Sequence, residues 1–274
     1  MSRVVFGCGR PAVAFLVVCL LIALFQVVPS APLIVAANRD ERYDRPAVAV
    51  TTLRDAQPRV LGGRDEVAGG TWLAVNEFGV LAGLTNVPSP QGRDTTKRSR
   101  GELPVALAAH QDAAAAVAWI RATVDPSDYN PCWLLVGDRE SLFYVDLTGG
   151  PRPAARELPP GSYVLENSPL EPMSAKADHV AGQIAAAGGG AAGAAEVRDG
   201  LAAILRDHSA VMGDTAPGAT RPGWLSAACV HGNGYGTRSA MIVTVGVTGR
   251  PEVLVADGPS CQAPLADVSE LWEG

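Results

Sequence analysis

Two apolar runs close together in the chain place the strongest limit on its fold. Leu20 to Phe25 and Leu33 to Ala37 contain no polar side chain, and a proline-containing stretch, Val28 to Pro32, lies between them. Runs this short favour strands over helices, and unbroken hydrophobicity indicates burial on both faces. We therefore expect a strand pair, over 19–25 and 33–39, covered by further layers on both sides.

Each expected strand carries a reactive or charged group at one end. Cys19 begins the first run, and Asn38-Arg39-Asp40-Glu41 ends the second. Strands hold side chains rigidly, and charged groups at strand ends shift the pKa values of their neighbours. The hypothesis is that Cys19 and this cluster form two walls of one site. Arg39 and Asp40 are the candidates for chemistry, while the residues on either side of them would brace the strand end.

The rest of the chain groups strands with strands and helices with helices. Further strands are expected over 71–75, 80–84, 132–136, 142–147, 163–166, 227–230, 238–247 and 252–256. Helices are expected after the Ser99-x-x-Glu102 capping signature, over 112–120, over 175–187 and over 196–208, with loops over 42–46, at Gly62-Gly63 and over 188–195. Gly79 should supply a positive φ in a hairpin turn. This order predicts an α+β fold, with two antiparallel sheets and helices outside them.

Composition limits the classes of function. The chain has 274 residues, 47% of them hydrophobic, which is enough for a sizeable core. Its net charge of −6 argues against a nucleic-acid partner, because such proteins are usually basic. The five cysteines are widely spaced and form no CxxC pair, so no disulfide framework is indicated. Cys229-Val230-His231 alone is weak evidence for a metal, and Cys132 and Cys261 are expected to be inert buried thiols, so neither a metal nor a cofactor is predicted.

The first thirty residues allow several interpretations. Arg3 and Arg10 precede an apolar stretch from Pro11 to Phe25, which is typical of a secretory signal but shorter than the roughly 20 apolar residues of a spanning helix. Cleavage after such a signal would remove the first predicted strand. We therefore expect an extension over 1–18, a single domain over 19–274, no stable membrane span and a cytoplasmic protein. The alternative is an anchored or exported protein whose residues 1–30 act as a signal.

A cysteine nucleophile needs a base, and none lies near Cys19 in the sequence. His231 could approach it in space, and a second base is available if Cys19 is the first residue. Its α-amino group would then have an unperturbed pKa of about 7.7–8.0, suited to general-base catalysis near neutral pH. Val18 precedes Cys19, and a valine codon can serve as a bacterial start that is read as methionine. Synthesis that starts at Val18 and then loses this methionine would expose the amine, and self-cleavage between Val18 and Cys19 would give the same end.

Short motifs along the chain match, in order, those of one family. They are Cys19-Leu20-Leu21-Ile22, Asn38-Arg39-Asp40-Glu41, Tyr43-Asp44-Arg45-Pro46, Gly62-Gly63-Arg64-Asp65, Gly70-Thr71-Trp72-Leu73-Ala74, Asn76-Glu77-Phe78-Gly79, Leu84-Thr85-Asn86, Ser99-Arg100-Gly101-Glu102-Leu103 and Tyr235-Gly236-Thr237-Arg238-Ser239. After residue 18 the chain thus resembles the NRDE family, also called the transport and Golgi organisation protein 2 family. Members usually begin at Met-Cys, so the extension over 1–18 departs from the pattern.

The resemblance implies the four-layer αββα fold of N-terminal-nucleophile hydrolases. It also implies working residues like those of choloylglycine hydrolases and penicillin V acylases: a cysteine nucleophile, an Arg/Asp pair, two asparagines and a late arginine. The residues that fall at those positions are Cys19, Arg39, Asp40, Asn86, Asn167 and Arg238. Structural roles stay open for each of them: a buried thiol, an ion pair, turn hydrogen bonds and a surface salt bridge.

Two functions follow from the resemblance. The first is a cysteine hydrolase that cleaves a linear, non-peptide amide through a thioester acyl-enzyme. The second is a non-catalytic protein of haem, lipid or acyl-CoA trafficking that uses the same fold. The sequence carries no CxxCH or Cys-Pro haem motif, so haem rests on the resemblance alone. In both cases the expected partner is a small molecule: an acyl amide, a lipid or haem.

Overall fold

Two antiparallel sheets packed face to face form the centre of the structure, a computed structural model that describes residues 19–187, 193–211 and 223–273. The first sheet has the order β10 (Gly161–Leu165), β1 (Leu20–Val28), β2 (Ala31–Arg42), β11 (Tyr235–Val245), β12 (Glu252–Ala256) and β13 (Ala266–Asp267). The second has the order β3 (Ala47–Arg54), β4 (Val60–Asp65), β5 (Leu73–Asn76), β6 (Leu81–Asn86), β7 (Cys132–Gly137), β8 (Leu142–Asp146) and β9 (Ala154–Glu157).

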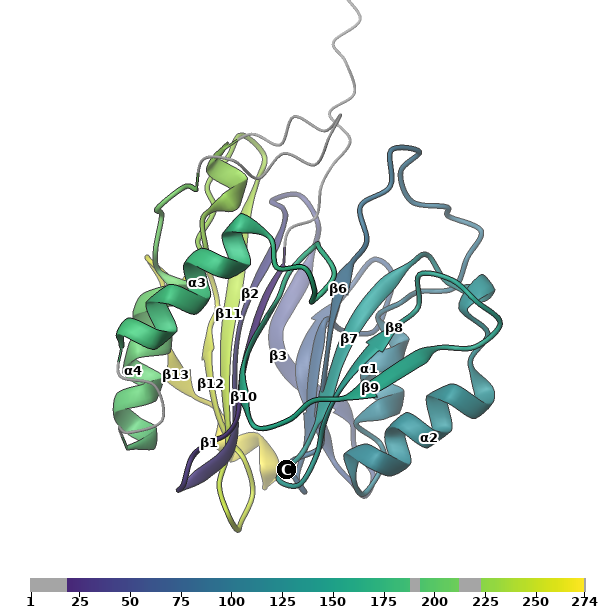
Figure 1. Ribbon diagram of the computed structural model, residues 1–274, viewed down its shortest axis with the longest axis horizontal. Helices are drawn as coiled ribbons and strands as arrows, with labels where there is room; N and C mark the ends of the chain where they lie inside the picture. The colour runs from purple at the N-terminus through teal and green to yellow at the C-terminus, as the bar shows by residue number, and fades with distance from the viewer. Residues whose placement is uncertain (1–18, 188–192, 212–222, 274) are drawn as a thin grey trace, which may run out of the picture.

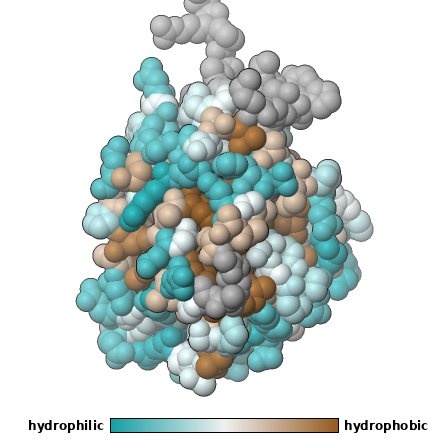
Figure 2. Space-filling model, turned by 60° about the vertical axis from the view of Figure 1, so that its left-hand side comes forward, coloured by the Kyte–Doolittle hydropathy of each residue, from teal (hydrophilic) through white to brown (hydrophobic). Residues whose placement is uncertain are grey.

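Helices cover the outer face of each sheet. α3 (Ala175–Ala186) and α4 (Ala194–Leu205) lie against the first sheet, and α1 (Glu102–Leu107) and α2 (Ala113–Thr123) lie against the second (Figure 1). The layers therefore follow the order αββα, as the sequence predicted. Figure 2 brings the α3 and α4 side forward and shows hydrophilic residues spread over it, with hydrophobic side chains in smaller patches between them. None of the helices in the described ranges is long and apolar enough to cross a bilayer.

Three apolar layers separate these elements. Odd-numbered side chains of β1 and β2, such as Leu21 and Val35, enter the core between the sheets. Even-numbered side chains, such as Ile22 and Ala36, pack under α3 and α4. Successive side chains of a strand point to opposite faces, so both faces of these strands must be apolar. This confirms that the two apolar runs form a strand pair buried on both sides.

Several local predictions are confirmed and others are wrong. Asp112 caps α2 by accepting a hydrogen bond from the Ala115 N–H at 2.7 Å, and Gly79 has a φ of 94°. The Ser99-x-x-Glu102 capping box does not form, because the Glu102 carboxylate binds the Tyr129 hydroxyl and Arg98 instead.

The strand predicted over 227–230 is absent, although its neighbour β11 is present. The Cys229 N–H donates to the Asp207 carbonyl and the Val230 N–H to Thr237 Oγ1, so these groups bind a loop and a side chain rather than a neighbouring strand. The sequence also missed the strands β3, β4, β9 and β13.

Gly62 and Gly63 lie within β4, where a loop was expected. A Cβ on Gly62 would lie 2.4 Å from the Leu73 carbonyl oxygen, and one on Gly63 would lie 2.1 Å from the Trp72 ring. These glycines therefore permit close packing within a strand rather than a turn. The expectations for residues 1–18, and for 188–192 of the loop over 188–195, lie outside the described residues.

Candidate functional site

Cys19 lies directly before β1, beside the end of β2 that carries the charged cluster. Leu20 pairs with Asn38 across the two strands, so the next positions bring Cys19 next to Arg39 and Asp40. The alternation of β2 continues through the cluster. Arg39 belongs to the series that points between the sheets, whereas Asn38 and Asp40 belong to the series that points toward the helix layer.

Arg39 is buried between the sheets, against residues of the second sheet. Its guanidinium lies 4.5 Å from the centre of the Trp72 ring, and its Nη2 is 3.9 Å from Asp65 and 3.8 Å from Glu41. Burial lowers the pKa of Arg39, and the acidic neighbours Cys19, Glu41 and Asp65 act against that shift. An arginine stacked on a ring and facing two carboxylates is a cation held in one orientation.

Asp40 is fully buried on the opposite face of β2. Thr237 Oγ1 donates a hydrogen bond to Asp40 Oδ1 at 2.6 Å and accepts one from the Val230 N–H at 2.9 Å. The threonine thereby connects the carboxylate to the segment before β11. Asn38, two residues earlier on the same face, donates to the carbonyl oxygens of Leu205 and Ala228, both at 2.8 Å. Its side chain fastens the end of α4 to that same segment.

Asn167, at the end of β10, joins Cys19 to the second sheet. Its Oδ1 accepts a hydrogen bond from the Cys19 nitrogen at 2.9 Å, and its Nδ2 donates to the Asn86 carbonyl oxygen. One N–H of this amide is therefore committed to the backbone, which leaves at most one for a substrate. The Asn86 side chain makes no hydrogen bond within the described part of the chain and is half-buried at the end of β6.

Arg238 does not join this group. Its Nη1 donates to the carbonyl oxygens of Arg42, the last residue of β2, at 2.9 Å and of Tyr43, in the loop that follows, at 2.6 Å. The register of β11 against β2 shifts between Thr237 and Ser239, so Arg238 is the extra residue of a bulge. His231, which we expected could approach Cys19, lies instead against the sulfurs of Cys229 and Cys261.

Arg100 is a site residue that the sequence analysis missed. It is half-buried, and its Nη1 donates to the Pro131 carbonyl oxygen at 3.0 Å. Burial lowers the pKa of Arg100, and the charges of Cys132 and Cys19 act against that shift. The available signal was the Ser99-Arg100-Gly101-Glu102 motif, which had been assigned to helix capping.

The Cys19 thiol is held in its neutral form. Burial is the largest cause that raises its pKa to about 12, and the Asp40 carboxylate adds to it. A hydrogen bond from the Asp40 backbone and the charge of Arg39 act in the other direction and are outweighed. Arg39 thus lowers the thiol pKa by its charge, but burial outweighs this effect in the chain in which the Cys19 nitrogen is a peptide nitrogen.

We expect the stability of this chain to fall as the pH rises from 9 toward 12. An unfolded thiol loses its proton near 9.0, whereas burial holds the pKa of both Cys19 and Cys132 at about 12. Across this range the unfolded state binds fewer protons, so the thiol contribution is complete below pH 9 and is lost above it. The free energy of unfolding, measured with urea between about pH 8 and about pH 10.5, should fall as the pH rises. Cys132→Ala should reduce the steepness of this fall by the equivalent of roughly one proton. An unchanged slope in that variant would contradict the assignment.

Comparisons with known proteins found similar sequences. A sequence model of the family "Transport and Golgi organisation 2" matches residues 18–254. The human transport and Golgi organization protein 2 homolog is 35% identical over 147 residues, and its mouse counterpart is 33% identical over 147 residues. Each alignment covers 51% of this chain and 51% of the relative, so the chain spans about half the length of the curated relatives it matches.

Two solved structures share the architecture. A mutant of the conjugated bile acid hydrolase from Clostridium perfringens has a TM-score of 0.55 at 11% identity, covering 92% of this chain and 93% of that one. The Caenorhabditis elegans ortholog of N-acylethanolamine-hydrolyzing acid amidase has a TM-score of 0.52 at 12% identity, covering 82% and 92%. At such identities the likeness concerns the fold alone, and it confirms the predicted N-terminal-nucleophile hydrolase fold.

Proposed function

Because this chain belongs to the transport and Golgi organisation 2 family and has the N-terminal-nucleophile hydrolase fold, we propose that it is a cysteine hydrolase of linear, non-peptide amides. In the active chain Cys19 is the first residue and its nitrogen is a free α-amine. The observation that carries this proposal is the 2.9 Å hydrogen bond between that nitrogen and Asn167 Oδ1, because it fixes the nitrogen beside its own thiol.

The proposed reaction uses this amine as the general base. The amine takes the proton of the Cys19 thiol, and the thiolate attacks the amide carbon to give a tetrahedral oxyanion. The proton then passes to the leaving amine as the carbon–nitrogen bond breaks, which leaves a thioester on Cys19. Water, activated by the same amine, hydrolyses the thioester and regenerates the thiol.

A free amine also changes the electrostatics of the thiol. Once protonated, it is a positive charge next to the sulfur and favours the thiolate, as the nearby Arg39 and Arg100 do. Asp40, whose charge acts on the Cys19 thiol, would balance that ammonium. The half-buried Asn86 amide is the candidate donor to the oxyanion, a role worth about 2.7–4 kcal/mol in a well-studied hydrolase.

The substrate class is proposed from the two structural neighbours. One is described as a conjugated bile acid hydrolase and the other as an N-acylethanolamine-hydrolyzing acid amidase. Both names describe hydrolysis, and the second names an N-acyl amine. An amide joining an acyl group to a small amine is therefore the first class to test on this chain.

The test compares a chain that begins at Cys19 with the chain of residues 1–274. Protein that begins at Cys19 should form a hydroxylamine-sensitive acyl adduct with an acyl p-nitroanilide and release p-nitroaniline, whereas residues 1–274 should do neither. Intact mass before and after hydroxylamine measures the adduct, and peptide mapping should assign it to Cys19. The proposal fails if neither chain forms the adduct. A saturable Soret change with micromolar haem in both chains would then support the trafficking role.

A further inference from the structure

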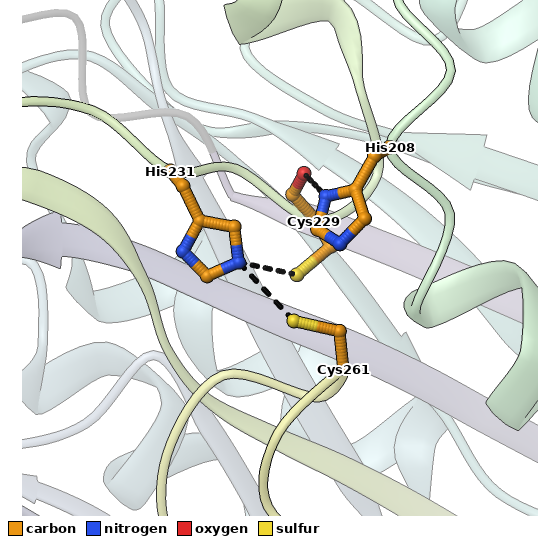
Figure 3. A group of neighbouring side chains, drawn as sticks. All are labelled: His208, Cys229, His231 and Cys261. Atoms are coloured by element: carbon orange, nitrogen blue, oxygen red, sulfur yellow. Dashed lines mark hydrogen bonds between the residues drawn. The ribbon is translucent and has the colours of Figure 1, made fainter.

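Two cysteines and two histidines meet on the surface of the first-sheet half of the molecule, away from the contacts of Cys19. His208 follows α4, Cys229 and His231 lie in the segment before β11, and Cys261 lies between β12 and β13. Their side chains converge on one point from three separate segments (Figure 3). One nitrogen or sulfur of each residue lies within 4.8 Å of the corresponding atom of every other.

The spacing of these atoms is close to that of a tetrahedral metal site. Ligands at about 2.3 Å for sulfur and about 2.0–2.1 Å for nitrogen stand roughly 3.3–3.8 Å apart at the corners of a tetrahedron. His231 Nε2 is 3.1 Å from Cys261 Sγ and 3.8 Å from Cys229 Sγ, so these contacts lie on either side of the expected separation. Side-chain movements of about 1 Å would complete the geometry.

The ligands are oriented by contacts of their own. His208 Nδ1 lies 3.0 Å from the Cys229 carbonyl oxygen, so the proton belongs on Nδ1 and Nε2 keeps its lone pair. Figure 3 shows that second ring nitrogen on the side of the Cys229 sulfur. A ligating histidine that donates its other N–H to a carbonyl is the usual outer-shell arrangement of zinc sites.

The three segments are also joined to one another by hydrogen bonds. The Cys229 N–H donates to the Asp207 carbonyl oxygen at 2.8 Å, next to His208. Ser260, next to Cys261, donates through Oγ to the Leu205 carbonyl, and its own carbonyl accepts from Arg206 Nε at 3.1 Å. The four side chains are thus brought together by the fold rather than by a flexible loop.

We propose that His208, Cys229, His231 and Cys261 bind one zinc ion as a tetrahedral Cys₂His₂ site. Two thiolates and two imidazoles, without a carboxylate, select zinc over calcium or magnesium. Binding replaces the two thiol protons, which are released to solvent, by the metal. Four protein ligands leave no open position, so the ion has a structural role. This inference does not rest on the proposed hydrolase activity, and it revises the expectations that Cys261 is an inert buried thiol and that no metal binds.

Hydrogen bonds through one residue connect the proposed zinc site to the candidate active site. Val230 lies between Cys229 and His231, and its N–H donates to Thr237 Oγ1, which donates to Asp40. A zinc ion that holds both flanking side chains would therefore fix the position of Val230, and with it the hydrogen bond that orients the Asp40 carboxylate. The metal would act as a positioning element for Asp40 and take no part in the chemistry.

Cobalt(II) provides a direct probe of the site in the full-length protein. We expect one Co²⁺ per chain, with near-ultraviolet thiolate charge transfer and the intense visible bands of tetrahedral cobalt, all removed by one equivalent of Zn²⁺. Cys261→Ala and His231→Ala, which alter at least partly exposed residues, should retain the native circular dichroism. Each should lose the cobalt bands and weaken Zn²⁺ binding at least about a hundredfold. Cys132→Ala, a buried thiol of β7, is the matched control and should bind like the parent.

Three results would overturn the site. The first is the absence of thiolate charge transfer when the folded parent is loaded with Co²⁺. The second is a Cys261→Ala variant that keeps the cobalt spectrum and the Zn²⁺ affinity of the parent. The third is a Cys229–Cys261 disulfide in protein purified with a reductant, because oxidised sulfurs cannot serve as thiolate ligands.

Discussion

Replacing Cys19 with alanine in a chain that begins at residue 19 should lower kcat/KM for an acyl amide at least about a thousandfold. The alanine chain keeps the free α-amine and the hydrogen bond from that nitrogen to Asn167. It loses the sulfur proposed to form the thioester, together with the hydrogen bond that the Asp40 backbone makes to that sulfur. Catalysis that survives would come from binding and oxyanion stabilisation alone, which is the residual that hydrolases retain when the nucleophile is removed.

Cys132 offers a matched control for this experiment. Both thiols are buried, and burial holds the pKa of each at about 12. Cys132→Ala removes the same atoms from β7 and should change kcat/KM by less than about threefold, since it does not bear the acyl group. If the two variants lost activity equally, the effect would belong to packing, and Cys19 would not be the nucleophile.

Replacing Asn38 with alanine should lower the free energy of unfolding by about 2–4 kcal/mol. The Asn38 amide donates to the Leu205 and Ala228 carbonyl oxygens, and no other described donor serves Ala228. The variant therefore loses two hydrogen bonds and leaves a buried carbonyl without a partner, and each such orphan costs about 1–3 kcal/mol. Urea unfolding followed by circular dichroism measures the change.

The exposed Asn233 provides the comparison for this stability measurement. Asn233→Ala makes the same chemical change in the turn before β11 and should alter stability by less than about 0.5 kcal/mol. Asn38→Ala should also weaken cobalt binding, because Asn38 fastens the segments that carry His208 and Cys229. A loss in Asn38→Ala no greater than that in Asn233→Ala would show that Asn38 is not the brace described here.

The sequence identified β1, β2 and the location of the charged cluster, because both signals are local. Continuous hydrophobicity marks a strand buried on both faces, and strand ends can be counted along the chain. Period-two alternation further implies that Arg39 and Asp40 face opposite sides. It cannot show what lies on each side, because Trp72 and Thr237 come from other strands.

Other parts of the site depend on tertiary structure that no short stretch of the sequence indicates. The bulge at Arg238 turns a residue expected at the site toward the loop after β2. The proposed zinc ligands are separated by 21 residues between His208 and Cys229 and by 30 between His231 and Cys261. Cys229-Val230-His231 gives a weak local signal for two of them, but the first-sheet topology and the end of α4 bring in the other two, so no spacing rule for metal motifs could detect the full set.

The buried faces of β1 and β2 have a consequence for how the chain finds its alignment. In most sheets one face is apolar and the other polar, so a slip by one residue is strongly disfavoured. Here both faces are apolar, and a slipped pairing of Leu20–Phe25 with Leu33–Ala37 would bury nearly the same surface. The errors would appear at the polar end, where Arg39 would leave Trp72 and Asp40 would leave Thr237. The cluster proposed for catalysis therefore also distinguishes the native register of β1 and β2 from the slipped ones. Substitutions in the cluster are expected to produce molecules with a slipped register as well as inactive ones.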